Sequence, residues 1–117
     1  MKSQRVYLQH ILERIIQIER FTEDGRDAFM MDDRTQEAVM RCFEVIGEAV
    51  KRLDPDLKAQ QPDISWQGFA GFRDVLIHQY DVIDIAKVWE AVQEDIPSLK
   101  VAVESLLMNL SKDENTL

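Results

Sequence analysis

The sequence contains little cysteine, glycine or proline, with one, four and three residues respectively among 117. A single cysteine, Cys42, excludes a disulfide within the chain and fits a reducing compartment, so we expect a cytoplasmic protein with Cys42 packed in its core. Because 45% of the residues are hydrophobic, the composition favours a compact, helix-rich fold over disorder. The length suffices for one domain, residues 1–117, and not for two.

Long apolar runs and metal-ligand clusters are missing as well. The first helix-like segment carries Glu13, Arg14 and Glu19, so we expect neither a signal peptide nor a membrane span. There is no Gly-rich phosphate loop, and His10 has no cysteine or second histidine at ligand spacing. We interpret His10 as a surface or interface residue and expect neither a metal nor a cofactor.

The sequence has few basic residues. It contains 14 Lys and Arg and 22 Asp and Glu, which gives a net charge of −8. This balance argues against a broad basic surface for nucleic acid, and we expect no DNA partner. An RNA substrate would have to be held by a small local cluster of basic side chains. An acidic surface suits a basic protein partner instead.

Apolar residues recur at three- and four-residue steps along most of the chain, which predicts amphipathic helices. We expect an all-α fold, an antiparallel bundle of four to five helices. The predicted helices cover residues 5–21, 27–31, 34–53, 66–80 and 85–110, with a connector over residues 54–64 and a polar, frayed tail over residues 110–117.

Capping residues and prolines predict where these helices begin and end. Asp54 before Pro55 should end the second long helix, and Pro97 should kink or restart the last one. The expected N-caps are Asp33, with Gln36 as its capping-box partner, Ser65 and Asp84.

Two positions in the second and third long helices need an explanation. Gly47 lies in mid-helix, where glycine costs about 1 kcal/mol relative to alanine, and we interpret it as a point of close helix approach. The neighbouring Glu48 is either solvated or lies against a basic group such as Arg73. Trp66 is interpreted as a packing anchor, with base stacking as the alternative.

Residues 72–81 carry most of the candidate chemistry, because Arg73, Asp74, His78 and Tyr80 fall within eight positions. On a helix, Asp74 and His78 share a face, whereas Arg73 and His78 point about 140° apart. Either the helix breaks between Arg73 and His78, or a second chain supplies the missing partner. Arg73, Ile77 and Tyr80 share one stripe, so a symmetric pair of such segments could form a single cleft.

These residue types suit phosphodiester cleavage without a metal. A histidine can move a proton to or from a ribose hydroxyl near neutral pH, and an arginine can bind the phosphate. Asp74 would raise the pKa of His78 and orient its ring if it reached it. The alternative is a plain structural role, with Asp74 and His78 as a surface pair and Arg73 in an ordinary salt bridge.

Two blocks of this sequence resemble a known family. The order Arg-x4-His-x-Tyr at residues 73–80, preceded by Ile-Ser-Trp-Gln-Gly-Phe at 64–69, is similar to the signature of HepT-like proteins of the HEPN superfamily. The Ile-Gly-Glu-Ala core at 46–49 is similar to the central helix of that family. The likeness extends over residues 5 to 107.

The resemblance implies an all-helical homodimer that is the toxin of a two-gene toxin-antitoxin module. Such a toxin is a metal-independent endoribonuclease that leaves a 2′,3′-cyclic phosphate. Arg73 and His78 match the catalytic pair, with Asp74 and Glu48 in supporting positions, and Tyr80 matches the tyrosine to which a nucleotidyltransferase antitoxin transfers AMP. Many HEPN proteins carry Asn where this sequence has Asp74, which adds a negative charge beside the phosphate site. A non-enzymatic helical dimer that binds, or is modified by, such a nucleotidyltransferase is the alternative.

Overall fold

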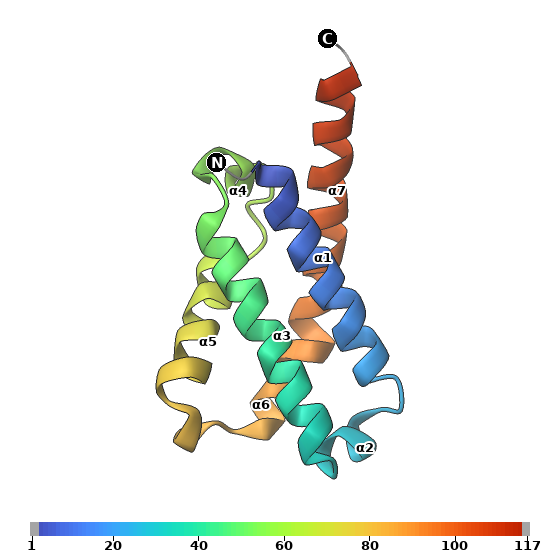
Figure 1. The fold of residues 1–117 in the computed structure, drawn as a ribbon, viewed down its shortest axis with the longest axis vertical. Coiled ribbons are helices and arrows are strands. Elements are labelled where there is room, and N and C mark those ends of the chain that lie inside the picture. Colours follow the sequence, from blue (N-terminus) through green and yellow to red (C-terminus); the bar gives the residue numbers. More distant parts are fainter. Residues whose placement is uncertain (1–2, 116–117) are drawn as a thin grey trace.

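The fold is built from helices throughout residues 3–115, the part of the chain that the computed structural model describes (Figure 1). The expected all-α class is confirmed, and no strand occurs among the described residues. The α-helices are α1 (Gln4–Phe21), α2 (Arg26–Met30), α3 (Asp33–Arg52), α4 (Pro55–Ala59), α5 (Trp66–His78), α6 (Ile85–Glu90) and α7 (Ile96–Asn115), with a 3₁₀ turn at Tyr80–Val82 and a π turn at Ala91–Asp95.

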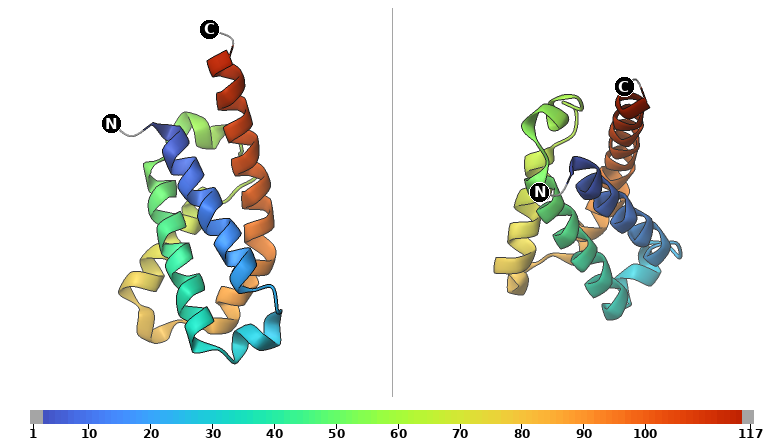
Figure 2. Two further views of the ribbon diagram at one scale, coloured as in Figure 1. Left: turned by 45° about the vertical axis from the view of Figure 1, so that its right-hand side comes forward. Right: turned by 45° about the horizontal axis from the view of Figure 1, so that its top comes forward.

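The long helices run up and down the bundle in chain order. Figure 1 shows α1 descending, α3 returning, α5 descending and α6 with α7 returning, so that neighbours in sequence are antiparallel. In all views α3 lies between α1 and α5 (Figure 2). The long axis measures 51 Å against 28 and 25 Å for the other two. No helix in the described part of the chain is both long and apolar enough to cross a membrane.

The core follows from the apolar stripes of α1, α3 and α7. Each helix buries one face at three- and four-residue intervals, as an amphipathic helix does. Cys42 lies in this core, as expected. The fully buried side chains include Leu8, Ile11, Ile15 and Ile18 from α1, Val39, Phe43, Ile46 and Val50 from α3, and Leu99, Val103 and Leu106 from α7.

The cap of α3 lies one residue earlier than expected. Asp32 is the N-cap, and its Oδ1 accepts hydrogen bonds from the backbone N–H groups of Arg34 and Thr35 at 3.0 and 3.4 Å. The prediction of Asp33 with a Gln36 capping box was wrong, because Gln36 donates its side-chain amide to the carbonyl of Phe29 instead, at 3.0 Å. Gln36 therefore ties α3 to α2.

Prolines end or restart helices where the sequence predicted. α3 ends at Arg52, and Pro55 occupies the first turn of α4, a short helix within the expected connector. Asp84 caps α6, since its carboxylate accepts from the N–H of Ala86 at 3.0 Å. Pro97 cannot donate a backbone hydrogen bond, and the π turn at Ala91–Asp95 precedes the helix that restarts at Ile96.

The C-terminal segment differs from expectation. α7 continues to Asn115, so residues 110–115 of the expected tail are helical, and residues 116–117 lie outside the described part. The end of α7 rises beyond the other helices (Figure 1).

Candidate active site

The helix that carries the motif, α5, is anchored at its start by aromatic packing. Trp66 is buried, and its Nε1 donates to the carbonyls of Lys58 and Gln61, both at 3.1 Å, so it packs as expected and does not present a stacking platform. Ser65 precedes the helix but makes no capping hydrogen bond with its side chain. Further along, the Phe72 ring meets Phe43 of α3 edge-on, with ring centroids 5.1 Å apart.

Gly47 allows α5 to lie directly on α3. A Cβ atom built on Gly47 would overlap the Cβ of Arg73 and lie 2.9 Å from the backbone oxygen of Phe69. Real Cβ atoms do not approach other heavy atoms this closely, so the position excludes any larger residue without movement of α5. The expected close helix approach is confirmed, and it is the approach that places Arg73.

Arg73 is held by two carboxylates. Its Nε lies 3.3 Å from Oε2 of Glu48, and its Nη1 lies 3.1 Å from Oδ1 of Asp74. The Nε atom is buried, and the contact with Glu48 is an ion pair without hydrogen-bond geometry. Of the two alternatives for Glu48, the contact with Arg73 is the one observed. Because the Arg73 side chain is only 23% exposed, its guanidinium is oriented by its surroundings.

Asp74 does not contact His78. Its Oδ1 accepts hydrogen bonds from Lys51 Nζ at 2.7 Å and from Arg73 Nη1 at 3.1 Å. The hydrogen bond from Lys51, followed by the one from Arg73, lowers the pKa of Asp74 below its ordinary value. The condition under which Asp74 would orient His78 is therefore not met in this structure, and Asp74 instead contacts Arg73 and joins α5 to α3.

His78 and Tyr80 lie at the exposed end of α5. The helix runs without a break from Trp66 to His78, so Arg73 and His78 point in different directions on one rigid element. The His78 ring is exposed and makes no hydrogen bond or ion pair to any residue within 3–115. Tyr80, in the 3₁₀ turn that follows, is 75% exposed. Of the two sequence alternatives, a helix break between Arg73 and His78 is excluded.

Arg73 faces a cavity of about 480 Å³ that spans three helices. α3 forms its floor, while α1 and α5 form opposite walls. Several of the polar side chains gathered there could not be assigned to a site from the sequence. The polar lining residues are Tyr7 and His10 from α1, Arg41, Glu44, Glu48 and Arg52 from α3, and Arg73 from α5.

Part of this cluster was visible in the sequence. Arg41, Glu44, Glu48 and Arg52 recur at three- and four-residue steps, which places them on one polar stripe of α3. Arg41 pairs with Glu44 at 3.2 Å and Arg52 with Glu48 at 3.1 Å. The two arginines and two glutamates of this stripe balance in charge, so Arg73 leaves the cavity lining with three cations against two carboxylates. His10 could not be assigned to it without the packing of α1 on α3.

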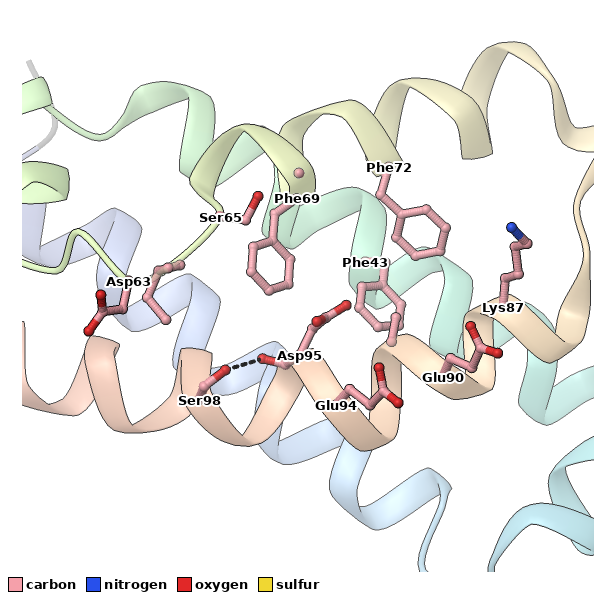
Figure 3. A pocket seen from close by; sticks show the side chains of 13 residues that line it. Phe43, Asp63, Ser65, Phe69, Phe72, Lys87, Glu90, Glu94, Asp95 and Ser98 are labelled. Atoms are coloured by element: carbon pink, nitrogen blue, oxygen red, sulfur yellow. Dashed lines mark hydrogen bonds between the residues drawn. The ribbon is translucent and has the colours of Figure 1, made fainter.

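A second cavity, of about 460 Å³, lies on the other side of α5 (Figure 3). Its floor is aromatic, and its rim carries one cation, Lys87, against four carboxylates. Such a rim repels an RNA phosphate, so the cavity beside Arg73 is the better candidate for RNA. No three His, Cys, Asp or Glu side chains among residues 3–112, whose side chains the structure describes, are arranged to hold a metal ion. The floor is formed by Phe43, Phe69 and Phe72, and the acidic rim by Asp63, Glu90, Glu94 and Asp95.

The chain is similar in sequence to proteins of a known family. Residues 11–106 match the family model described as "Ribonuclease HepT-like". A Thermococcus cleftensis protein named as a ribonuclease HepT is 44% identical over 106 residues, which cover 90% of this chain and 96% of that protein. A Methanocaldococcus jannaschii protein named as an RNase is 39% identical, over 97% of this chain and 95% of its own length.

A further relative is longer than this chain. It is a Methanocaldococcus jannaschii protein whose name combines a gamma-glutamylcyclotransferase with an RNase, and it is 40% identical over 97% of this chain. The chain spans about half of that relative, 52% of its length. No solved structure matches the chain.

Proposed function

Because the chain belongs to the HepT-like ribonuclease family, we propose that it is a metal-independent endoribonuclease in which Arg73 of one chain and His78 of a second chain act on the same phosphodiester bond. The observation that carries the proposal is the geometry of α5. Arg73 is fixed at a cavity that two further arginines line, whereas His78, five residues on, is exposed and free of partners in the described part of the chain. A symmetric dimer brings the two faces together.

The chemistry of this pair is an in-line transfer within RNA. His78 takes the proton from a ribose 2′-hydroxyl, O2′ bonds to phosphorus, and the bond from phosphorus to O5′ breaks. A group on the opposite side returns a proton to O5′. Arg73 stabilises the charge that grows on the phosphoryl oxygens. The products are a 2′,3′-cyclic phosphate and a 5′-hydroxyl end.

The test is cleavage of a mixed RNA in EDTA, followed by analysis of the product ends. We expect the wild-type protein to cleave and to leave cyclic phosphates, and we expect Arg73→Ala and His78→Ala to reduce the rate by about 10²-fold or more. Gln79→Ala is a matched control, since Gln79 is an exposed neighbour of His78. Cleavage that requires added magnesium would show that the mechanism is wrong.

The regulation we propose is transfer of AMP to Tyr80 by a nucleotidyltransferase antitoxin, with the chain as the toxin of the pair. The exposure of the phenol supports this, since 75% of Tyr80 is accessible and it follows α5 directly. An added phosphate beside the site would compete with RNA for Arg73. The other tyrosine, Tyr7, lies half-buried on α1 and serves as an internal comparison.

Peptide mapping tests this regulation. After reaction with a nucleotidyltransferase and ATP, the mass increase of one AMP should appear on the peptide containing Tyr80 and be absent in Tyr80→Phe. An adduct confined to peptides that lack Tyr80 would contradict the assignment.

A second candidate function is favoured by the charge of the chain. With a net charge of −8 and Arg73 already paired to two carboxylates, the protein also suits a non-enzymatic role as a helical partner of a nucleotidyltransferase. Expression of His78→Ala separates the two functions. Loss of growth inhibition without loss of helicity supports the ribonuclease, whereas unchanged inhibition supports the binding role.

A further inference from the structure

The reaction proposed above needs two proton transfers, and a single His78 on one side of phosphorus can perform only one of them. In-line displacement places the attacking and leaving oxygens on opposite sides of phosphorus, so the base and the acid must approach from opposite directions. The chain contains only two histidines, His10 and His78. The structure places the other histidine, His10, in the cavity that Arg73 faces.

The position of His10 follows from how α1 lies along α3. At one end, the Gln4 side chain accepts from the backbone N–H of Asp54 at 2.7 Å and donates to the carbonyl of Arg52 at 3.3 Å. Toward the other end, Cys42 Sγ lies 3.5 Å from Gln17 Oε1. This antiparallel register sets His10 beside the middle of α3, where the cavity floor lies. His10 and Arg73 therefore stand on opposite walls of one cavity.

The His10 ring is available for proton transfer. It is half-buried, and it makes no hydrogen bond or ion pair to the residues that the structure describes. Neither ring nitrogen is a buried atom left without a partner, so both are accessible from the cavity. Here both ring nitrogens remain free for a ligand in the cavity.

Other titratable groups that face His10 are less suited to donate a proton near neutral pH. Glu44 and Glu48 on α3 are paired with arginines, and Tyr7 on α1 is a phenol. The remaining charged groups that line the cavity are Arg41 and Arg52 on α3 and Arg73 on α5. An imidazole is the group whose ordinary pKa matches the task.

On this basis we propose that His10 is the general acid of the reaction and belongs to the same half-site as Arg73. The proposal rests on the proposed ribonuclease function. When O2′ bonds to phosphorus and the bond to O5′ breaks, the His10 imidazolium gives its proton to O5′. His78 of the second chain takes the proton of the 2′-hydroxyl. Exchange with water returns both histidines to their starting protonation states.

A pair of substrates distinguishes an acid from a merely structural residue. One is a dinucleotide, whose leaving ribose oxygen needs a proton. The other is a nucleoside 3′-(p-nitrophenyl phosphate), whose phenolate leaves without one. We expect His10→Gln and His10→Asn to reduce the single-turnover rate on the dinucleotide by about 10²- to 10⁴-fold and to leave the rate on the nitrophenyl ester close to that of the wild type.

Controls keep the test specific to His10. Gln9→Ala changes an exposed neighbour on α1 that is outside the cavity, and it should cleave both substrates normally. His78→Gln should lose both activities, because the base is needed with either leaving group. In the pH profile on the dinucleotide, His10→Gln should also lose the fall in rate at high pH that deprotonation of the acid causes.

Four results would overturn the proposal in distinguishable ways. Normal cleavage of the dinucleotide by His10→Gln would exclude a role for His10 and point to the second His78 as the acid. Equal loss on both substrates would make His10 a positioning residue, and rescue of His78→Gln by the nitrophenyl ester would reverse the two roles. Absence of cleavage by the wild-type protein would contradict the ribonuclease function itself.

Discussion

Arg73 is held between two carboxylates, and the strength of these contacts decides whether it can still bind a phosphate. Glu48 and Asp74 have 42% and 48% of their side-chain surface exposed. Ion pairs this exposed are individually weak because water screens them. A guanidinium that forks onto a phosphate makes stronger, charge-assisted hydrogen bonds. The carboxylates therefore orient Arg73 without preventing a phosphate from binding to it.

The contribution of Asp74 to the stability of the fold should depend on pH. Hydrogen bonds from Lys51 and Arg73 lower its pKa in the folded protein. A carboxylate with a lowered pKa stabilises the fold above its unfolded pKa, about 3.9, and this contribution is lost as the pH falls through the folded value. We expect Asp74→Asn to melt below the wild type at pH 7, with the difference in Tm shrinking progressively below about pH 4.

The partner lysine provides the control for this measurement. Lys51→Met should lower Tm in the same way, and the double variant should lose less than the sum of the two single losses, because both remove one interaction. Additive losses, or a Tm difference that is the same at pH 3 and pH 7, would contradict the role assigned to the pair.

The position of α5 depends on its contact with α3. Phe72 packs on Phe43, and Arg73 lies on Gly47, while the acidic cavity separates α5 from α6 and the start of α7 (Figure 3). The Arg73 side chain can face its cavity only if the two backbones approach this closely. The position of Arg73 in the site therefore depends on Gly47.

Alanine at Gly47 tests this dependence. Removing glycine from a helix interior gains about 1 kcal/mol, but overpacking a tight contact costs about 1–3 kcal/mol, so Gly47→Ala should lower the free energy of unfolding and displace Arg73. Gly71→Ala is the matched control, because a Cβ atom built on Gly71 would meet nothing within 4 Å and should stabilise α5. Equal stabilisation by both variants in urea denaturation would contradict the account.

Local patterns predicted the elements well and the long-range partners poorly. The helix periods, the stop at Asp54 and the restart at Pro97 all depend on neighbours within one turn. The cap of α3 was misplaced because Asp32 and Asp33 are chemically identical and adjacent, and only the packing of α2 distinguishes them. The partner of Asp74 lies 23 residues away at Lys51, and His10 reaches its cavity through the packing of α1 on α3, so neither could be predicted from spacing.

For the whole molecule, charge is distributed between two cavities. The net charge of −8 argues against broad RNA binding, yet the cavity that Arg73 lines carries three arginines against two glutamates, while the other cavity carries one lysine against four carboxylates. RNA held by so few cations should contact few phosphates, so its affinity should depend only moderately on salt. A basic protein partner can approach the acidic remainder of the surface at the same time.

If Arg73 and His78 from two chains act on one phosphodiester bond, two variants that are each inactive should restore activity when they are mixed. Arg73→Ala and His78→Ala should each be inactive in EDTA. After the two are unfolded and refolded together, mixed dimers hold one intact site, so about a quarter of the wild-type rate should return. The wild type refolded with the double variant is the control. A mixture that stays inactive while the refolded wild type cleaves would show that the two residues do not act across chains.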